Sequence, residues 1–494
     1  MKSARLRCIA WATGAALILC ASGATTAGET SASAASVRGR LHLFVDAHDI
    51  ASSRSVTLRM HPPCAEQVVL RLDAPWEGEG SAYATVLLDG PKWRMYYRGG
   101  GELTQEVTCV VESNDGVAWT RPQLGLFDFD GSRENNIVWR APDRKSYGGS
   151  HNMSPFIDTN PEAQPDARYK AAALGWHVGA DGKKRKALDT LASPDGLHWR
   201  VVSRDAVTTG SFDSQNVIFW DEVQRFYRCY LRHGRAGVRS VMLTTSTDFT
   251  RWSEPQFLDF SATPLEHFYT NGIVPYFRDP TWYVGLPMRF VPGRTSVGEP
   301  ARATNGLSDA VLITSRNGIH FDRTFMEAFI RPGLESTHWG NAHGNQTPAW
   351  GLHPAGTSHM AVFWFGQEAE VPTLRRGLLR LDGFASLNAG YGGGEAVIRV
   401  LAPSEGAGAR LVLNLATSAV GSVRVEVQDA EGAPIPGFAL ADCLPAWGDE
   451  IARAMRWRGG DALPAANSES APNGGVRLRF ALMDADLYSF HFVH

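Results

Sequence analysis

A short turn motif recurs through the middle of the chain and constrains its fold more than any other feature. The motif reads Ser-x-Asp/Asn-Gly/Phe-x-x-aromatic, and its copies begin at Ser113, Ser193, Ser246 and Ser315. A degenerate fifth copy begins at Arg380. The copies recur at intervals of roughly 50 to 80 residues, which fits one four-stranded unit per copy with loops of variable length. This pattern predicts a radial array of small β-sheets, in which the inner loops usually carry function.

The segments between these turns alternate apolar and polar residues and are bounded by turn residues, which favours strands over helices. The second strand of each unit is the clearest, at 93–97, 168–174, 225–231, 281–286 and 359–365. No convincing amphipathic helix interrupts the pattern. We therefore predict an all-β chain with a five-bladed β-propeller over residues 41–390.

The pattern changes after a glycine-rich junction at 388–394. Clean alternation then follows in four short segments, at 395–401, 410–415, 422–428 and 476–482. Turn residues separate these segments, which is typical of an antiparallel β-sandwich. We predict this second domain over residues 391–494.

The N-terminal residues have the pattern of a secretory signal peptide. A charged start, an apolar stretch over 8–20 and then small residues allow cleavage after Ala24 or Ala27. We assign 1–27 to the signal peptide and the Ser/Ala-rich residues 28–40 to a linker, and we predict a secreted or periplasmic product. A lipoprotein is the weaker alternative, because leucine precedes the cysteine of the apolar stretch. No other segment of the sequence indicates a transmembrane span.

The net charge and the cysteine spacing bear on which ligands and cross-links the chain is expected to have. The formal net charge is −3, so the sequence has no basic excess for nucleic acid. Beyond the leader, Cys64, Cys109, Cys229 and Cys443 stand singly, which favours buried free thiols. The sequence holds no CxxC or HExxH spacing, and we predict neither a metal nor a cofactor.

Polar residues at the start of each unit's first strand are the candidate site, because innermost strands begin at the mouth of a propeller's central channel. These starts lie at 76–79, 151–152, 212–216, 266–271 and 341–346. The candidates are Trp76, Glu77, His151, Asn152, Asp213, Gln215, Asn216, Glu266, His267, Tyr269, Asn271 and His343. Carboxylates brought together in this way suit hydrolysis of a glycosidic bond, which needs one proton donor and one base or nucleophile.

The roles follow from the neighbouring residues. We assign Asp213 as the base or nucleophile, because the polar residues 214–216 follow it and are able to keep it hydrogen-bonded and ionised. We assign Glu266 as the general acid, because its apolar neighbours favour a protonated carboxyl group. Glu77 is the third carboxylate. Arg98, at the end of the first unit's second strand, and Arg289, after the fourth unit's second strand, are candidate contacts for a uronate or a sulfated sugar.

The repeated turns, the five units and the trailing sandwich resemble the furanosidase-type glycoside hydrolases, the clan that contains families 32, 43, 62, 68 and 130. The segments 94–99, 213–216 and 264–267 look more narrowly like uncharacterised secreted proteins of planctomycete-type bacteria. The resemblance implies catalytic carboxylates at the inner ends of the first three blades, where this chain has Glu77, His151 and Asp213.

Two details depart from that resemblance. The second blade has a histidine where the resemblance implies a carboxylate. The Arg-Asp-Pro sequence at 278–280 matches a family 32 motif, but it falls between two predicted strands, and we interpret it as a turn.

The sequence thus predicts a secreted glycoside hydrolase that cleaves a polysaccharide or oligosaccharide. Two alternatives remain open. One is a propeller that binds carbohydrate without chemistry. The other is a polysaccharide lyase, in which His151 or His267 with Tyr269 removes a proton from a uronate-containing glycan.

Overall fold

The structure is a computed structural model. It describes residues 40–78, 80–100, 106–140, 151–178, 181–295, 305–334, 336–339, 346–368, 371–402, 408–463 and 475–494. Regular structure in these residues is almost entirely strand; the helical segments are two 3-10 turns, η1 (Pro165–Ala167) and η3 (Ser336–Trp339). Within the same residues, no helix has the length and apolar character needed to cross a membrane. The prediction of an all-β chain is confirmed.

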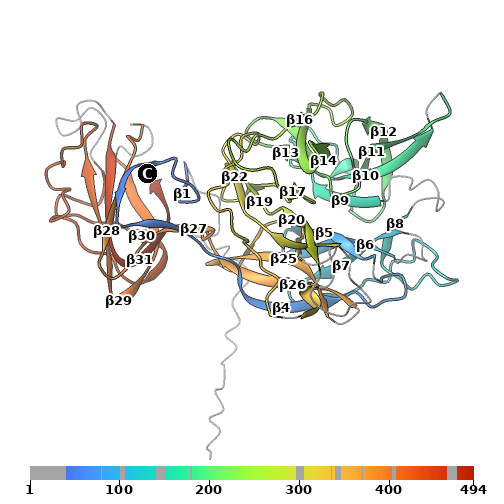
Figure 1. Ribbon diagram of the computed structural model, residues 1–494, viewed down its shortest axis with the longest axis horizontal. Helices are drawn as coiled ribbons and strands as arrows, with labels where there is room; N and C mark the ends of the chain where they lie inside the picture. Colours follow the sequence, from blue (N-terminus) through green and yellow to red (C-terminus); the bar gives the residue numbers. More distant parts are fainter. Residues whose placement is uncertain are drawn as a thin grey trace, which may run out of the picture.

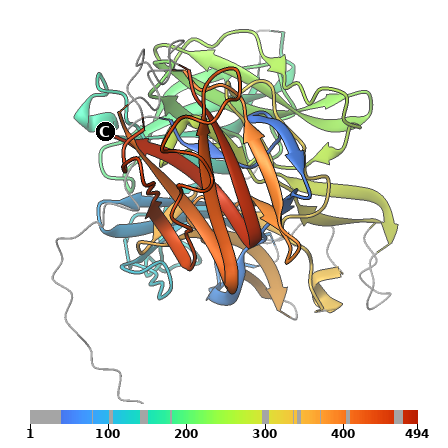
Figure 2. The ribbon, with the colours of Figure 1, turned by 90° about the vertical axis from the view of Figure 1, so that its left-hand side faces the viewer.

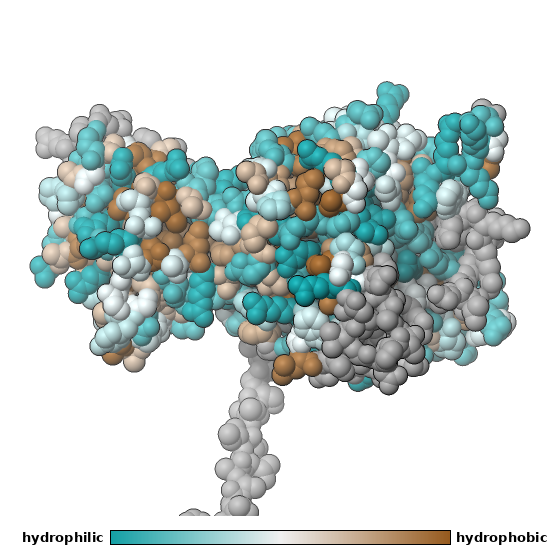
Figure 3. Space-filling view, viewed as in Figure 1, coloured by the Kyte–Doolittle hydropathy of each residue, from teal (hydrophilic) through white to brown (hydrophobic). Residues whose placement is uncertain are grey.

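The chain forms two lobes (Figure 1). The larger lobe contains strands β4 to β26, and the smaller lobe contains the C-terminal strands together with the first strands of the chain. Figure 2, in which the smaller lobe faces the viewer, shows its long strands lying in front of the larger lobe. On the face seen in Figure 3, hydrophilic residues predominate and hydrophobic residues form separate patches on both lobes.

Three four-stranded antiparallel sheets follow one another along the chain in the larger lobe, each with its strands in sequence order. The first contains β5 (Ala82–Asp89), β6 (Lys92–Gly99), β7 (Val107–Ser113) and β8 (Ile137–Arg140). The second contains β9 (His151–Ile157), β10 (Tyr169–Val178), β11 (Lys184–Ser193) and β12 (Arg200–Val207). The third contains β13 (Val217–Asp221), β14 (Phe226–Arg235), β15 (Val238–Ser246) and β16 (Gln256–Phe257).

The next part of the chain forms two three-stranded sheets. One contains β17 (His267–Phe268), β20 (Met288–Thr295) and β21 (Asn305–Ala310). The other contains β18 (Val274–Tyr276), β19 (Asp279–Gly285) and β22 (Ile313–Ser315). Only two residues separate β19 from β20, and two separate β21 from β22, so each pair continues a single strand path across both sheets.

The last sheet of the larger lobe takes its outer strand from the other end of the chain. It contains β23 (Thr347–Pro348), β24 (His353–Ala355), β25 (His359–Glu368), β26 (Val371–Arg380) and β4 (Cys64–Arg71). Strand β4 pairs antiparallel with β26, so that Cys64 lies opposite Leu378. Figure 1 shows β4 beside β26. The N-terminal strand thus links the two ends of this set of sheets.

The repeated turns form as predicted at the ends of β7, β11, β15 and β22. In the first turn, Oδ1 of Asp115 accepts hydrogen bonds from the backbone N–H groups of Val117 and Ala118. Oγ of Ser113 accepts one from Gly116, whose φ of 71° favours glycine. Asp195, Asp248 and Asn317 repeat these bonds. The local motif therefore specifies the turn through its own side chains.

The smaller lobe contains an eight-stranded sheet that differs from prediction at both ends of the chain. Its strands are β1 (His42–Leu43), β2 (Ile50–Arg54), β3 (Thr57–Met60), β27 (Ala385–Ala389), β28 (Gly394–Ile398), β29 (Arg410–Gln428), β30 (Asp449–Ala454) and β31 (Arg477–Val493). The predicted strands at 410–415 and 422–428 belong to one long strand, because β31 pairs with both parts of β29 on either side of a register shift between Thr417 and Ser422.

The domain boundary predicted at residue 41 is wrong for residues 42–60, which are hydrogen-bonded to C-terminal strands. The reason is packing: Phe44 lies in the core of the smaller lobe, and Ile50, Val56 and Leu58 pack against that core. Burial of these apolar side chains stabilises the arrangement.

The Arg-Asp-Pro segment lies between the lobes, where β18 ends and β19 begins. Oδ2 of Asp279 accepts a hydrogen bond from the N–H of Leu41 at 2.8 Å. Arg278 lies 3.2 Å from Asp382, which also accepts a hydrogen bond from Ser489 of β31. These residues are buried. The segment therefore joins the lobes, in agreement with its interpretation as turn rather than catalytic sequence.

The four cysteines in the described residues are free thiols. Cys109, Cys229 and Cys443 are buried, as predicted. Cys64 is exposed at the start of β4, which corrects the prediction for that residue.

Candidate functional site

A histidine that bridges two carboxylates lies at the centre of the candidate site. His151 begins β9, and its Nδ1 lies 2.5 Å from Oε2 of Glu106. Its Nε2 lies 2.9 Å from Oδ1 of Asp213, which precedes β13. The Asp213 side chain is 49% exposed, whereas that of His151 is 11% exposed. The structure brings the predicted pair His151 and Asp213 together and adds Glu106, which the sequence did not indicate.

The three groups hold one another in charged forms. The hydrogen bond with His151 is the main cause that holds the pKa of Asp213 well below its usual range. Burial alone would lower the pKa of His151, but its hydrogen bonds to Asp213 and Glu106 raise it. Burial alone would raise the pKa of Glu106, yet the hydrogen bond to His151 lowers it. These shifts all favour an imidazolium between two carboxylates.

Two residues beside this cluster have left-handed backbone conformations. Tyr83 has a φ of 56° and Asn152 a φ of 54°. Each lies where the pairing register shifts, in β5 against β6 and in β9 against β10. Bulges of this kind redirect side chains and are frequent next to active sites. Oδ1 of the buried Asn152 accepts a hydrogen bond from Arg98 at 2.8 Å.

Cations and aromatic rings surround the cluster. The Arg98 guanidinium lies 4.9 Å from the Tyr83 ring centre, and that of Arg232 lies 4.8 Å from the Tyr269 ring centre. Arg239 also lies over Tyr269, at 5.1 Å. The charges of Arg232 and Lys186 contribute to lowering the pKa of Asp213. We call this set the His151 site: Tyr83, Arg98, Glu106, His151, Asn152, Lys186, Asp213, Arg232, Arg239 and Tyr269.

Glu77 and Trp76 do not reach the His151 site. The Glu77 side chain is fully buried and accepts hydrogen bonds from Tyr97, Arg121 and the N–H of Ala74. Nε1 of Trp76 donates a hydrogen bond to Asn136. These contacts fix the segment before β5 to β6 and to the loop after β7, so the prediction that Glu77 lines the pocket is wrong.

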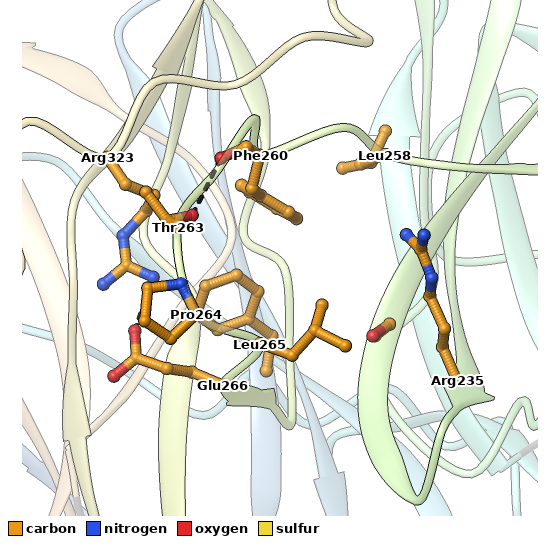
Figure 4. A pocket seen from close by; sticks show the side chains of 10 residues that line it. Arg235, Leu258, Phe260, Thr263, Pro264, Leu265, Glu266 and Arg323 are labelled. Carbon is orange, nitrogen blue, oxygen red and sulfur yellow. Dashed lines mark hydrogen bonds and ion pairs between the residues drawn. The ribbon is translucent and has the colours of Figure 1, made fainter.

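Glu266 also lies in a different setting from the predicted one. Oε1 is 2.9 Å from Arg289 and Oε2 is 2.6 Å from Arg323. Figure 4 shows Glu266 with Arg323 and Pro264 at one side of a small cavity that Arg235 lines from the other side. Both carboxylate oxygens are thus engaged by guanidinium groups, so this is not the apolar setting that was predicted for a proton donor. Arg289 is engaged by Glu266 and Asp309.

Most of the remaining predicted residues have structural contacts. Gln215 is buried and donates to the backbone oxygen of Ala84 and to Thr85, which links β5 to the segment before β13. Asn216 donates to two backbone oxygens of its own turn. Neither contacts Asp213, so His151 takes the role predicted for them.

The fourth unit contributes partly to the site. Nδ1 of His267 accepts a hydrogen bond from the N–H of Arg239 at 3.3 Å, and Tyr269 is part of the His151 site. Asn271 donates to the backbone oxygen of Tyr230. His343 lies outside the described residues.

Five residues of the site were missed from the sequence: Tyr83, Glu106, Lys186, Arg232 and Arg239. Tyr83 had a usable signal, because it stands near the start of the first unit's inner strand. No sequence motif marks the other four residues, which lie just before β7 or within β11, β14 and β15: Glu106, Lys186, Arg232 and Arg239.

No family model and no curated protein matches the sequence. Among solved structures, an N-acetylgalactosamine deacetylase from F. plautii in complex with blood group B trisaccharide has a TM-score of 0.45 and 15% identity, covering 65% of this chain and 94% of that chain. A family 43 arabinoxylan arabinofuranohydrolase from Bacillus subtilis gives 0.39 and 14%, covering 85% and 96%. A family 32 β-fructofuranosidase from Bombyx mori gives 0.40 and 9%, covering 88% and 94%. Several similar structures are thus glycoside hydrolases.

Proposed function

We propose that the chain is an exported glycoside hydrolase whose catalytic centre is the His151 site. The observation that carries the proposal is a half-exposed aspartate, Asp213, hydrogen-bonded to His151, a contact that lowers the pKa of the aspartate and raises the pKa of the histidine. The combination provides a base or nucleophile and a proton source within one cluster, and both are required to cleave a glycosidic bond.

We also propose that the larger lobe is a five-bladed propeller. The pair of three-stranded sheets counts as one blade, because its strand paths continue from one sheet into the other. The other four blades are the four remaining sheets, and β4 closes the ring. The smaller lobe, formed by residues 40–60 and 385–494, is then a separate β-domain. Residues 1–27 are the proposed export signal, and the likeness to secreted planctomycete-type proteins remains a prediction.

Asp213 acts on water or on the anomeric carbon. Among the described residues, its Oδ2 takes part in no hydrogen bond or ion pair, whereas Oδ1 faces His151. Oδ2 is therefore the atom that takes a proton from attacking water, or that attacks the anomeric carbon itself. The separation from the substrate decides between inversion and retention.

His151 supplies the proton for the leaving oxygen. A glycosidic oxygen that enters the site replaces Oδ1 of Asp213 as the partner of Nε2 and receives its proton as the bond to carbon breaks. Glu106 on the opposite nitrogen holds the ring in place and favours the imidazolium. Glu266 and Glu77 have no part in this assignment.

The substrate is an acidic glycan. Arg98, Lys186, Arg232 and Arg239 place four positive charges around two carboxylates, one of which is mostly buried. Guanidinium groups bind carboxylate and sulfate groups through paired hydrogen bonds. Tyr83 and Tyr269 supply aromatic faces at the same place.

The test compares Asp213→Asn and His151→Gln with the wild-type protein on uronate-containing and sulfated polysaccharides and on aryl glycosides. We expect Asp213→Asn to lower turnover by two or more orders of magnitude on every substrate. His151→Gln should lose activity on polysaccharides but keep much of it on aryl glycosides, whose leaving groups need little protonation.

Asp259→Asn is the matched control, because Asp259 forms an exposed pair with His320 at 2.8 Å, and it should behave as wild type. Near-normal turnover in the Asp213 variant would overturn the assignment. Binding of glycan with no turnover in the wild type would show a carbohydrate-binding propeller instead.

A polysaccharide lyase is the second candidate, favoured by Tyr269 between Arg232 and Arg239. In that reaction an arginine neutralises the uronate carboxylate, a neighbouring side chain removes the proton on the adjacent carbon, and the glycosidic oxygen leaves with a proton. The unsaturated product absorbs ultraviolet light, whereas a hydrolase releases a reducing end without that absorbance.

A further inference from the structure

Three side chains from neighbouring strands of the second sheet converge away from the His151 site. They are His177 on β10, Asp189 on β11 and Asp205 on β12. Their ligand atoms all lie within 4.8 Å of one another. Nε2 of His177 is 2.8 Å from Oδ1 of Asp189 and 3.4 Å from Oδ1 of Asp205. One imidazole nitrogen and two carboxylate oxygens thus face a common point.

One hydrogen bond lies within this arrangement, because Oδ1 of Asp189 accepts from the backbone N–H of Asp205 at 3.1 Å, but it leaves the other ligand atoms unexplained. The short contact between His177 and Asp189 lacks hydrogen-bond alignment, and Nε2 has no hydrogen-bond partner in the described part of the chain. Asp189 is fully buried, and its Oδ2 likewise has no hydrogen-bond partner there. Nη1 of Arg204 lies 3.8 Å from Oδ2, beyond hydrogen-bond distance, and the Arg204 side chain is 59% exposed. A buried carboxylate in this position is costly unless a cation compensates it.

Gly175 leaves open the space that an ion requires. A Cβ at this position would lie 2.5 Å from Nε2 of His177 and 2.7 Å from Oδ2 of Asp189. Any other residue would therefore press on both ligand atoms. Gly175 lies on β10 with an ordinary backbone conformation. Glycine is therefore needed here because it has no side chain, not because of its φ angle.

We propose that His177, Asp189 and Asp205 bind a divalent transition-metal ion, with Zn²⁺ or Mn²⁺ as the fitting class. Two carboxylates balance its charge, and an imidazole ligand favours these ions over Ca²⁺. Tetrahedral bonds of about 2.0–2.1 Å separate ligand atoms by about 3.3 Å. The distance of 3.4 Å already meets this, and the distance of 2.8 Å opens by a small side-chain movement.

The site is distinct from the His151 site. Because side chains alternate along a strand, His177 and Trp176 point to opposite faces of the sheet. Lys186, which acts on Asp213, lies over the Trp176 ring at 4.9 Å. The ion would tie β10, β11 and β12 together, and Asp205, with a half-exposed side chain, leaves a position open to water.

Metal binding to the full mature chain tests the proposal without any activity measurement. The chelator-treated protein is titrated with ZnCl₂, MnCl₂ and CaCl₂ by calorimetry, and its melting temperature is recorded with and without each ion. We expect one equivalent of Zn²⁺ or Mn²⁺ to bind and to raise the melting temperature.

His177→Gln and Asp205→Asn should weaken binding at least tenfold, and circular dichroism checks that both variants fold. His198→Gln is the matched control, because His198 forms an exposed pair with Asp195 at 2.7 Å in the turn between β11 and β12, and it should bind as wild type. Binding of Ca²⁺ alone, absence of binding in the wild type, or equal binding in the two site variants would overturn the proposal.

Discussion

Replacement of Glu77 by glutamine separates a structural carboxylate from a catalytic one. Glu77 has the position of a catalytic acid in the sequence pattern, but its side chain is fully buried. Its oxygens accept hydrogen bonds from Tyr97 at 2.5 Å and from two nitrogens of Arg121 at 3.0 Å and 2.8 Å. Glutamine keeps the volume and removes the charge, and its amide group cannot accept from all these donors.

The magnitude follows from those contacts. Each hydrogen bond to a charged group contributes about 1.5–3 kcal/mol, and the substitution removes or weakens two of them. Arg121 is 28% exposed, so water relieves part of the cost of its lost partner. We therefore expect Glu77→Gln to lower the free energy of unfolding by about 3 kcal/mol, less than the loss of a fully buried pair.

Thermal unfolding followed by near-ultraviolet circular dichroism measures this effect. A loss of about 3 kcal/mol should lower the first melting transition by roughly 5–12 °C. Below that transition, turnover per folded molecule should equal that of the wild type. Asp213→Asn should give the opposite pattern, with lost turnover and a smaller fall in melting temperature, because its side chain is 49% exposed. A Glu77→Gln protein that melts with the wild type but loses turnover would refute the reasoning.

Further predictions concern the pH dependence of activity and stability, and the role of Glu266. Since two carboxylates raise the pKa of His151, activity should be lost as pH rises through that pKa, and Glu106→Gln should move this alkaline limb of the pH–rate profile to lower pH. Burial and the charge of Arg278 lower the pKa of His491 from 6.5 to about 4. The free energy of unfolding should therefore be highest above pH 6.5 and fall by about 3 kcal/mol towards pH 4, as the unfolded chain takes up a proton more readily than the folded one. Thermal unfolding at several pH values should show a smaller loss in His491→Gln. Glu266→Gln should keep turnover within about threefold on good and poor leaving groups, because two arginines hold it away from proton transfer.

Local sequence was sufficient to predict the strands and turns of the larger lobe. The repeated turn is specified by bonds within a few residues, such as those of Ser113 and Asp115, so it is readable from the chain. The pairing partners of β1, β2 and β3 could not be predicted in this way, because these partners lie at the other end of the sequence. Nothing in residues 42–60 distinguishes a strand of one lobe from a strand of the other.

Residues of the candidate site could be predicted only where their position at the start of an inner strand brings them together. His151 and Asp213 begin or precede inner strands, and they meet. Glu77 and Glu266 were misassigned because Arg121, Arg289 and Arg323 approach them from other segments, which sequence spacing does not reveal.

The cluster of His177, Asp189 and Asp205 was missed for a related reason. Its ligands come from three strands whose spacing matches no metal motif. Only the pairing of those strands brings the three side chains together.

The pairing of β4 with β26 has a consequence for how the protein is made. Glu66 on β4 and Arg375 on β26 form an ion pair between residues 309 positions apart. Nearly all of the larger lobe is therefore synthesised before β4 is able to pair with β26. Until then, β4 and one edge of β26 are both unpaired. Long-range pairing of this kind slows folding and leaves strand edges exposed to other chains. We expect refolding to end in a slow, concentration-sensitive step in which β4 pairs with β26, and chaperones that shield strand edges should raise the yield.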